Sequence, residues 1–104
     1  MMPLDFAVLD PDGRIDRYVP IDPDAHHEIA SIASQNAFEL ILRFKDFYED
    51  ATVPIESFPS LSAEVAALQQ TPGVSEESRL FLSRLADLIG YAAEQGRPIQ
   101  AISD

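Results

Sequence analysis

The sequence has no cysteine, few cations and no long apolar run. The absence of cysteine excludes a disulfide framework, a thiolate metal site and a cysteine nucleophile. A membrane-spanning helix needs roughly 18 largely apolar residues, and no run approaches that length. The N-terminal residues Met1 to Asp5 lack the basic and apolar regions of a signal peptide. We therefore expect a cytoplasmic protein that does not insert into membranes.

Positive charge is scarce, because seven Lys and Arg residues stand against 18 Asp and Glu residues and give a net charge of −11. Such a surface repels nucleic acid and anionic lipid, and its natural complement is a basic protein. Between Asp46 and Ser78 there is no Lys or Arg, and the acids of this stretch are Asp46, Glu49, Asp50, Glu56, Glu64, Glu76 and Glu77. This distribution predicts a surface of one sign, although a purely solubilising role predicts the same excess.

The apolar content is sufficient for one hydrophobic core. Hydrophobic residues make up 46% of the 104 residues, which is typical of a globular protein and too high for a disordered acidic tail. No linker or internal repeat divides the chain. We expect a single domain over residues 1–104.

The N-terminal pattern predicts a β-hairpin. Leu4 to Leu9 and Arg14 to Ile21 are short runs rich in β-branched and aromatic residues, and they flank the turn Asp10-Pro11-Asp12-Gly13. Pro11 presets the backbone of a type I turn, and Gly13 supplies the left-handed position that closes it. Ile15, Val19 and Ile21 share the face expected to cover a core.

The rest of the chain predicts about four helices and a final strand, and hence an α+β fold. Helices are expected to start at Asp22-Pro23-Asp24, at Asn36, at Ser60 and at Ser75, each of which offers a capping side chain. The second helix, Ala37 to about Glu49, is apolar around most of its circumference. Ala51 to Pro59 indicates a loop or edge segment, and Pro98 to Ile102 indicates a short strand that returns to the hairpin.

The helix that starts at Ser75 carries the clearest pattern. Glu76 and Glu77 stand at its positive end, and Gly96 is expected to stop it. Its predicted inner stripe consists of Phe81, Leu85, Leu88 and Ala92.

The sequence contains no complete motif for a metal site or a cofactor site, so we expect no metal and no cofactor. Aligning Gly13 with the glycine of a calcium loop leaves valines at the two strongest ligand positions. His26 and His27 are adjacent, whereas a zinc pair on one helix needs a spacing of four, so both are interpreted as surface residues. The four glycines stand singly and form no phosphate-binding loop. No nucleophile elbow is present.

The acidic segment at the end of the second helix is the best candidate for a binding surface. Carboxylates near a helix C-terminus face the negative end of the dipole, and such a cost to stability marks a candidate for function. Aromatic area beside charge is also typical of protein interfaces. The predicted partner-binding residues are Asp46, Tyr48, Glu49, Asp50, Glu56 and Phe58. The alternative is that the aromatic residues are core and the acids form a solvated rim.

The order of these features resembles a known class of bacterial protein. The segments that carry the resemblance are DFAVLDPDGRI, YVPI, AHHEI, LILRFKDFYED and GRPIQAISD. Together they are similar to small acidic immunity proteins of polymorphic toxin systems, found at contact-dependent inhibition or type VI secretion loci. The resemblance implies a cytoplasmic protein that neutralises a toxin domain by tight binding. The resemblance assigns no toxin-contacting residue to this sequence, because the toxin-binding surfaces of these proteins vary.

The sequence therefore predicts an immunity or inhibitor protein that is not an enzyme and that binds a basic cognate toxin domain. One alternative is a self-associating or adaptor module that uses an apolar patch around Tyr48, Ile55 and Phe58. Another is an enzyme that uses carboxylates between Asp46 and Asp50, one of which would need a raised pKa.

Overall fold

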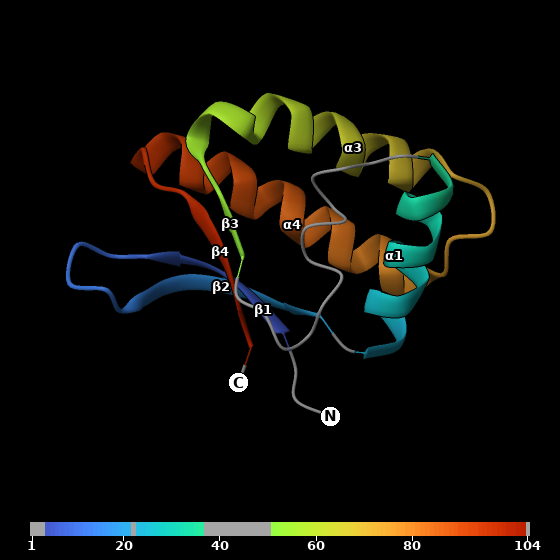
Figure 1. Ribbon diagram of the computed structural model, residues 1–104, viewed down its shortest axis with the longest axis horizontal. Helices are drawn as coiled ribbons and strands as arrows, with labels where there is room; N and C mark the ends of the chain where they lie inside the picture. The colour runs from blue at the N-terminus through green and yellow to red at the C-terminus, as the bar shows by residue number, and fades with distance from the viewer. Residues whose placement is uncertain (1–3, 22, 37–50, 104) are drawn as a thin grey trace.

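The computed structural model describes residues 4–21, 23–36 and 51–103. The fold combines helices with an antiparallel sheet, as expected for an α+β protein (Figure 1). In chain order the elements are β1 (Leu4–Leu9), β2 (Ile15–Ile21), α1 (Pro23–Asn36), β3 (Ala51–Val53), the 3₁₀ turn η1 (Ile55–Ser57), α3 (Phe58–Gln70), α4 (Glu76–Gln95) and β4 (Ile99–Ser103).

The number of helices differs from the prediction. The described residues contain three α-helices rather than about four, and the predicted helix from Ala37 to Glu49 lies outside them. None of the described helices has the length and apolarity needed to cross a membrane.

The sheet has four strands in the order β2-β1-β4-β3, with every neighbouring pair antiparallel. The predicted return of the C-terminal strand is confirmed, because Phe6 of β1 pairs with Ala101 of β4. The segment predicted as a loop or edge forms the edge strand β3, whose Val53 pairs with Ile99. Strand β2 forms the other edge of the sheet.

The predicted hairpin turn is confirmed in its details. The Asp10 carboxylate accepts hydrogen bonds from the backbone N–H groups of Asp12 and Arg14, both at 2.9 Å. Gly13 has φ of +82° and donates its N–H to the Asp10 carbonyl oxygen at 2.9 Å. Only a residue without Cβ adopts that φ freely, so Gly13 fixes the turn. The β1–β2 register shifts between Val8 and Leu9, which gives the hairpin its irregularity.

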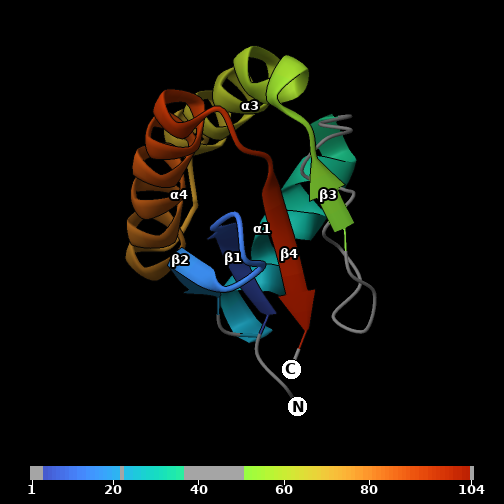
Figure 2. The ribbon, with the colours of Figure 1, turned by 90° about the vertical axis from the view of Figure 1, so that its left-hand side faces the viewer.

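The helices pack against the sheet, and α4 contacts β1, β2, α1 and α3, lying beside β2 in Figure 2. The rings of Phe6 and Phe81 lie with their centroids 5.3 Å apart across this interface. Among the described residues, the core contains Phe6, Val8, Val19, Ile21, Ala25, Ile29, Ala33, Val53, Phe58, Leu61, Val65, Leu68, Phe81, Leu82, Leu85, Leu88, Ile89, Ala92, Ile99 and Ala101. Each fully buried leucine of this set stabilises the fold by about 1.5–3 kcal/mol.

Two surface and core assignments from the sequence are wrong. Ile15 is 50% exposed, because the hairpin extends beyond the helices that cover Val19 and Ile21. His26 is buried at 4% exposure, whereas His27 is exposed as predicted. Position 26 lies on the side of α1 that packs against the core, which the sequence alone does not reveal.

Helix α4 begins and ends where the sequence predicts. The Ser75 hydroxyl oxygen accepts a hydrogen bond from the Ser78 N–H at 3.2 Å and thus caps the helix. Gly96 ends it in the left-handed conformation, with φ of +64°. The predicted inner stripe of Phe81, Leu85, Leu88 and Ala92 is buried.

Helix α3 begins three residues earlier than predicted. Its first residue is Phe58 and its N-cap is Ser57, so Ser60 is not the cap. The sequence interpretation used Pro59 to end a loop, but a proline fits the first helical turn equally well because that turn needs no N–H donor. The 3₁₀ turn η1 leads directly into this start.

Candidate functional site

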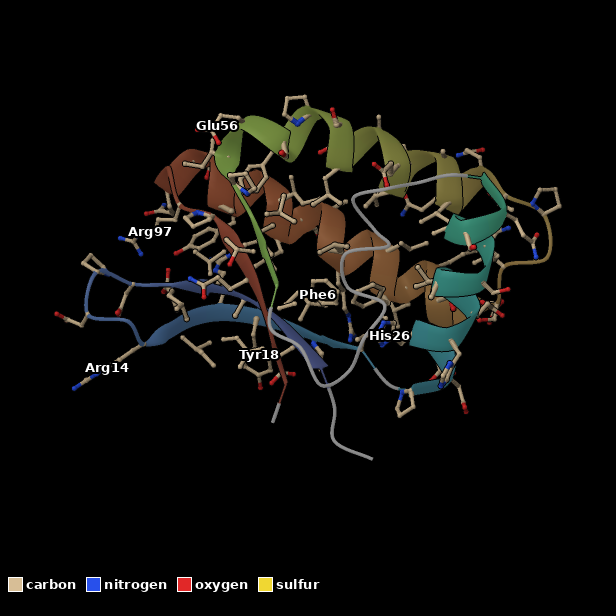
Figure 3. All side chains as sticks on the ribbon, viewed as in Figure 1. Phe6, Arg14, Tyr18, His26, Glu56 and Arg97 are labelled. Atoms are coloured by element: carbon tan, nitrogen blue, oxygen red, sulfur yellow. The ribbon has the colours of Figure 1, made fainter. Side chains whose placement is uncertain are left out.

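Two of the six predicted partner-binding residues fall within the described chain. Glu56 lies in η1 with its side chain exposed at the start of α3 (Figure 3). Phe58 is 4% exposed and belongs to the core, so its assignment to a binding surface is corrected. The others lie outside the described residues: Asp46, Tyr48, Glu49 and Asp50. Of the alternative apolar patch, Ile55 remains on the surface at 39% exposure.

The described acids of the stretch from Asp46 to Ser78 do not gather on one face. Glu56 precedes α3, whereas Glu76 and Glu77 form the first turn of α4. Helices α3 and α4 run in opposite directions, so these carboxylates lie at opposite ends of the pair (Figure 1). The 13 residues of α3 separate them by about 20 Å.

Several exposed carboxylates have no partner within the described residues. The side chains of Glu56, Glu76 and Glu94 are exposed and form no hydrogen bond or ion pair there. No described cation pairs with them, and their charge adds to the field of a molecule that carries −11 overall.

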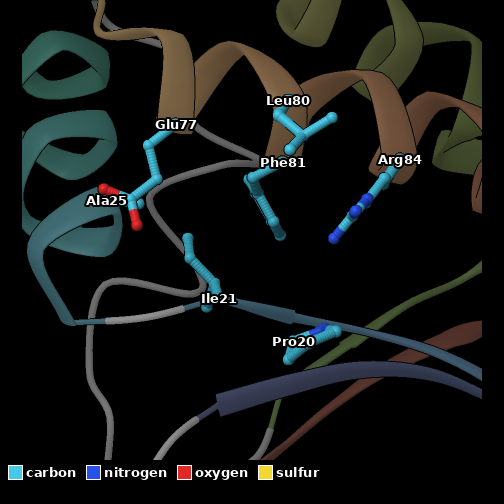
Figure 4. A pocket seen from close by; sticks show the side chains of 7 residues that line it. All are labelled: Pro20, Ile21, Ala25, Glu77, Leu80, Phe81 and Arg84. Carbon is cyan, nitrogen blue, oxygen red and sulfur yellow. The ribbon is translucent and has the colours of Figure 1, made fainter.

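A second surface feature is the β2–α4 groove, defined as two hollows between strand β2 and helix α4 that share Arg84. The first has a volume of about 320 Å³ and is lined by Pro20, Ile21, Ala25, Glu77, Leu80, Phe81 and Arg84 (Figure 4). The second has a volume of about 370 Å³ and is lined by Asp16, Arg17, Tyr18, Val19, Arg84, Asp87 and Leu88.

Exposed apolar area lies beside both hollows. Leu80 is 53% exposed beside the first, and Tyr18 is 58% exposed beside the second. The sequence interpretation missed Leu80. The available signal was that Leu80 is a large apolar residue outside the inner stripe of its helix, one position before Phe81.

Two arginines near the groove are already engaged at the C-terminal end of α4. The Arg17 guanidinium lies 4.0 Å from the centroid of the Tyr91 ring, and the Tyr91 hydroxyl donates a hydrogen bond to the Asp16 carboxylate. Arg97 lies 3.9 Å from the same carboxylate and donates to the Leu9 carbonyl oxygen at 3.3 Å. The hydrogen bond to Asp16 raises the pKa of Tyr91, and desolvation adds to the shift.

Arg84 is different, because it forms no hydrogen bond or ion pair with any described residue. Its guanidinium extends beside the hollow at the end opposite the Glu77 carboxylate (Figure 4). The groove therefore presents an available cation and an acid on either side of apolar surface.

At the N-terminal end of α4, a carboxylate has a structural role. Glu28 of α1 accepts hydrogen bonds from the Ser75 N–H at 3.0 Å and from the Ser75 hydroxyl at 2.9 Å. The pKa of Glu28 is lowered by hydrogen bonding to Ser78 and then to the Ser75 backbone. A carboxylate held in its charged form ties α1 to α4 and is not suited to act as a general acid.

The described residues contain no group of three or more His, Cys, Asp or Glu side chains placed to hold a metal ion. The described surface thus combines exposed carboxylates that have no described partner with a groove in which apolar area lies beside opposite charges. Comparison of the chain with protein-family models, with curated proteins and with solved structures finds no match.

Proposed function

We propose that this protein is an immunity or inhibitor protein, active in the cytoplasm of a bacterium, that neutralises a basic cognate toxin domain by binding it. The observation that carries the proposal is the set of exposed carboxylates that have no partner among the described residues, such as Glu56 and Glu76. In an acidic molecule such groups accelerate association with a basic protein by electrostatic steering. The resemblance to immunity proteins supplies the toxin as the basic partner.

The proposal assigns the contact to the acidic stretch that begins at Asp46. Neutralising Asp46, Glu49, Asp50 and Glu56 to Asn or Gln should slow association with the toxin domain encoded by the adjacent gene. The salt dependence of the association rate should also fall, because steering by exposed charges is screened by ions. Circular dichroism checks that the fold persists, and neutralising the exposed Glu56 should cost little stability.

Surface-based binding kinetics at low and high salt provide the measurement. The matched control neutralises four exposed acids elsewhere, which are Asp12, Asp24, Asp87 and Glu94. Asp10 is left unchanged because its carboxylate holds the hairpin turn. Both variants carry the same net charge. Equal slowing in both would mean that total charge acts rather than the stretch, and unchanged rates at both salts would refute the acidic contact.

A growth assay tests the biological part of the proposal. Cells that express the toxin domain should grow when this chain is expressed with it and should stop growing without it. Absence of both binding and protection would refute the immunity function, and protection without binding would refute inhibition by direct contact.

A further inference from the structure

The first hollow of the β2–α4 groove has complementary charges at its two ends. Glu77 and Arg84 are separated by two turns of α4, so they lie on the same side of the helix about 10 Å apart along its axis. Leu80 stands between them and is 53% exposed. Figure 4 shows the Glu77 carboxylate and the Arg84 guanidinium on either side of Leu80 and Phe81.

We propose that this surface joins two copies of the chain in a dimer with twofold symmetry. The α4 helices lie antiparallel across the axis, which passes beside Leu80. Glu77 of each copy then faces Arg84 of the other, and each Leu80 enters the hollow of the other copy beside Pro20 and Phe81.

The spacing of these residues fits that symmetry. In a twofold contact the same patch serves both copies, so it must be complementary to itself. Glu77 lies three residues before Leu80 and Arg84 lies four residues after it. When two such helices cross antiparallel with the axis beside Leu80, each acid meets the base of the other copy, and two Glu–Arg pairs form. The exposed leucine loses its water contact at the axis, where burial of an apolar side chain is most favourable.

Local charge balance favours a second copy at this surface. Two chains of net charge −11 repel each other unless the charges near the contact are balanced. At physiological salt, charges more than about 8 Å away are largely screened, so the local balance decides. Arg84 supplies the cation, and it has no partner among the described residues of its own chain.

The edge of β2 is not the means of association. Pro20 has no N–H to donate to an added strand, and Arg17 places a charge on the same strand. Both are features by which edge strands resist pairing with other chains. The contact therefore forms through the side chains of α4 and the hollow beside them.

Sedimentation velocity over a range of protein concentrations tests the dimer directly. The wild-type chain should pass from monomer to dimer as its concentration rises. Arg84→Glu or Glu77→Arg alone should raise the dissociation constant of the dimer by at least about tenfold, because like charges then face each other at both ends. The double variant Glu77→Arg with Arg84→Glu should restore the dimer, because the pairs are reversed but remain opposite.

Two further variants separate this contact from general effects. Leu80→Asp should give a monomer, whereas Arg14→Glu changes an exposed arginine at the hairpin and should leave the dimer intact. Circular dichroism checks that every variant is folded. A wild-type chain that stays monomeric, or a double variant that does not regain the dimer, would overturn the proposal. Toxin binding does not depend on this contact, so either result leaves the proposed function to its own test.

Discussion

The two ends of helix α4 are stabilised in different ways. At the N-terminal end, Ser75 caps the helix and the Glu28 carboxylate binds the cap by two short hydrogen bonds. At the C-terminal end the last turn contains no basic residue. The nearby cations are instead Arg17, from strand β2, and Arg97, which follows the C-cap residue. Each end thus receives the charge that complements the helix dipole.

The difference lies in what holds that charge in place. Glu28 is fixed by hydrogen bonds to a cap that the helix itself requires, whereas Arg17 and Arg97 act through an aromatic ring and an ion pair near solvent. Exposed charge pairs contribute at most about 1 kcal/mol and are weakened by salt, while a cap contributes about as much or more. We therefore expect the N-terminal end to contribute more to stability than the C-terminal charges do.

The largest effect is expected at the N-terminal cap. Ser75→Ala removes the acceptor for the Ser78 N–H and the hydroxyl donor to Glu28. The free energy of unfolding should fall by about 1–2 kcal/mol. Urea denaturation measures it, with Ser83→Ala, an exposed change within the same helix, as the control. A loss no larger than that of the control would mean that the cap contributes nothing.

The two glycines of α4 should respond in opposite directions. Gly96→Ala places a Cβ at φ of +64° and should destabilise the C-terminal end by about 1 kcal/mol. Gly90 has ordinary helical geometry and open space around its Cα, so Gly90→Ala should stabilise the protein by about 0.5–1 kcal/mol. Thermal melts of the two variants provide the measurement. A change of the same sign in both would contradict the argument from backbone conformation.

A smaller effect is expected from pH at the N-terminal end. Because the pKa of Glu28 is lower in the folded chain than in the unfolded one, its contribution is present above the ordinary pKa of Glu and is lost as pH falls through the folded value. Wild type should exceed Glu28→Gln in stability by under about 1 kcal/mol at neutral pH, because the carboxylate is only partly buried and is screened by solvent. The gap should narrow at an acidic pH below the ordinary pKa of Glu. Urea titrations at both pH values test this, and a gap that widens in acid would contradict it.

The smallest effect is expected at the C-terminal end, with the opposite pH dependence. The raised pKa of Tyr91 means that its contribution is present below the ordinary pKa of Tyr and is lost as pH rises through the folded value. Tyr91→Phe should lower stability only slightly at neutral pH. The absorbance change of tyrosine ionisation should lose its most alkaline component in this variant. An unchanged titration curve would show that the bond to Asp16 does not hold the proton.

Much of the local structure could be predicted from sequence because its causes are local. Gly13, Ser75 and Gly96 act on backbone within a few residues of themselves, so their roles are visible in the order of the chain. The same locality misled the prediction for α3. Ser60 is a good cap by composition, but Pro59 fits the first turn, and the helix starts at Phe58.

The candidate surfaces were harder to predict. The acidic excess is a property of composition, but the placement of Glu56 and Glu76 at opposite ends of two helices depends on how those helices run. The β2–α4 groove is lined by residues that are about 60 positions apart in the chain, such as Pro20 and Leu80. No local pattern reports such a pairing.

By itself the sequence determined the charge of this protein, its hairpin turn, the limits of α4 and the mixture of helices and strands. Tertiary structure decided the rest. It made an edge strand of Ala51–Val53, buried His26 and Phe58, left Leu80 and Ile15 exposed, and made β2 an edge of the sheet. The physical reason is that caps and turns are fixed by hydrogen bonds between near neighbours, whereas burial and strand pairing depend on which distant segments come together.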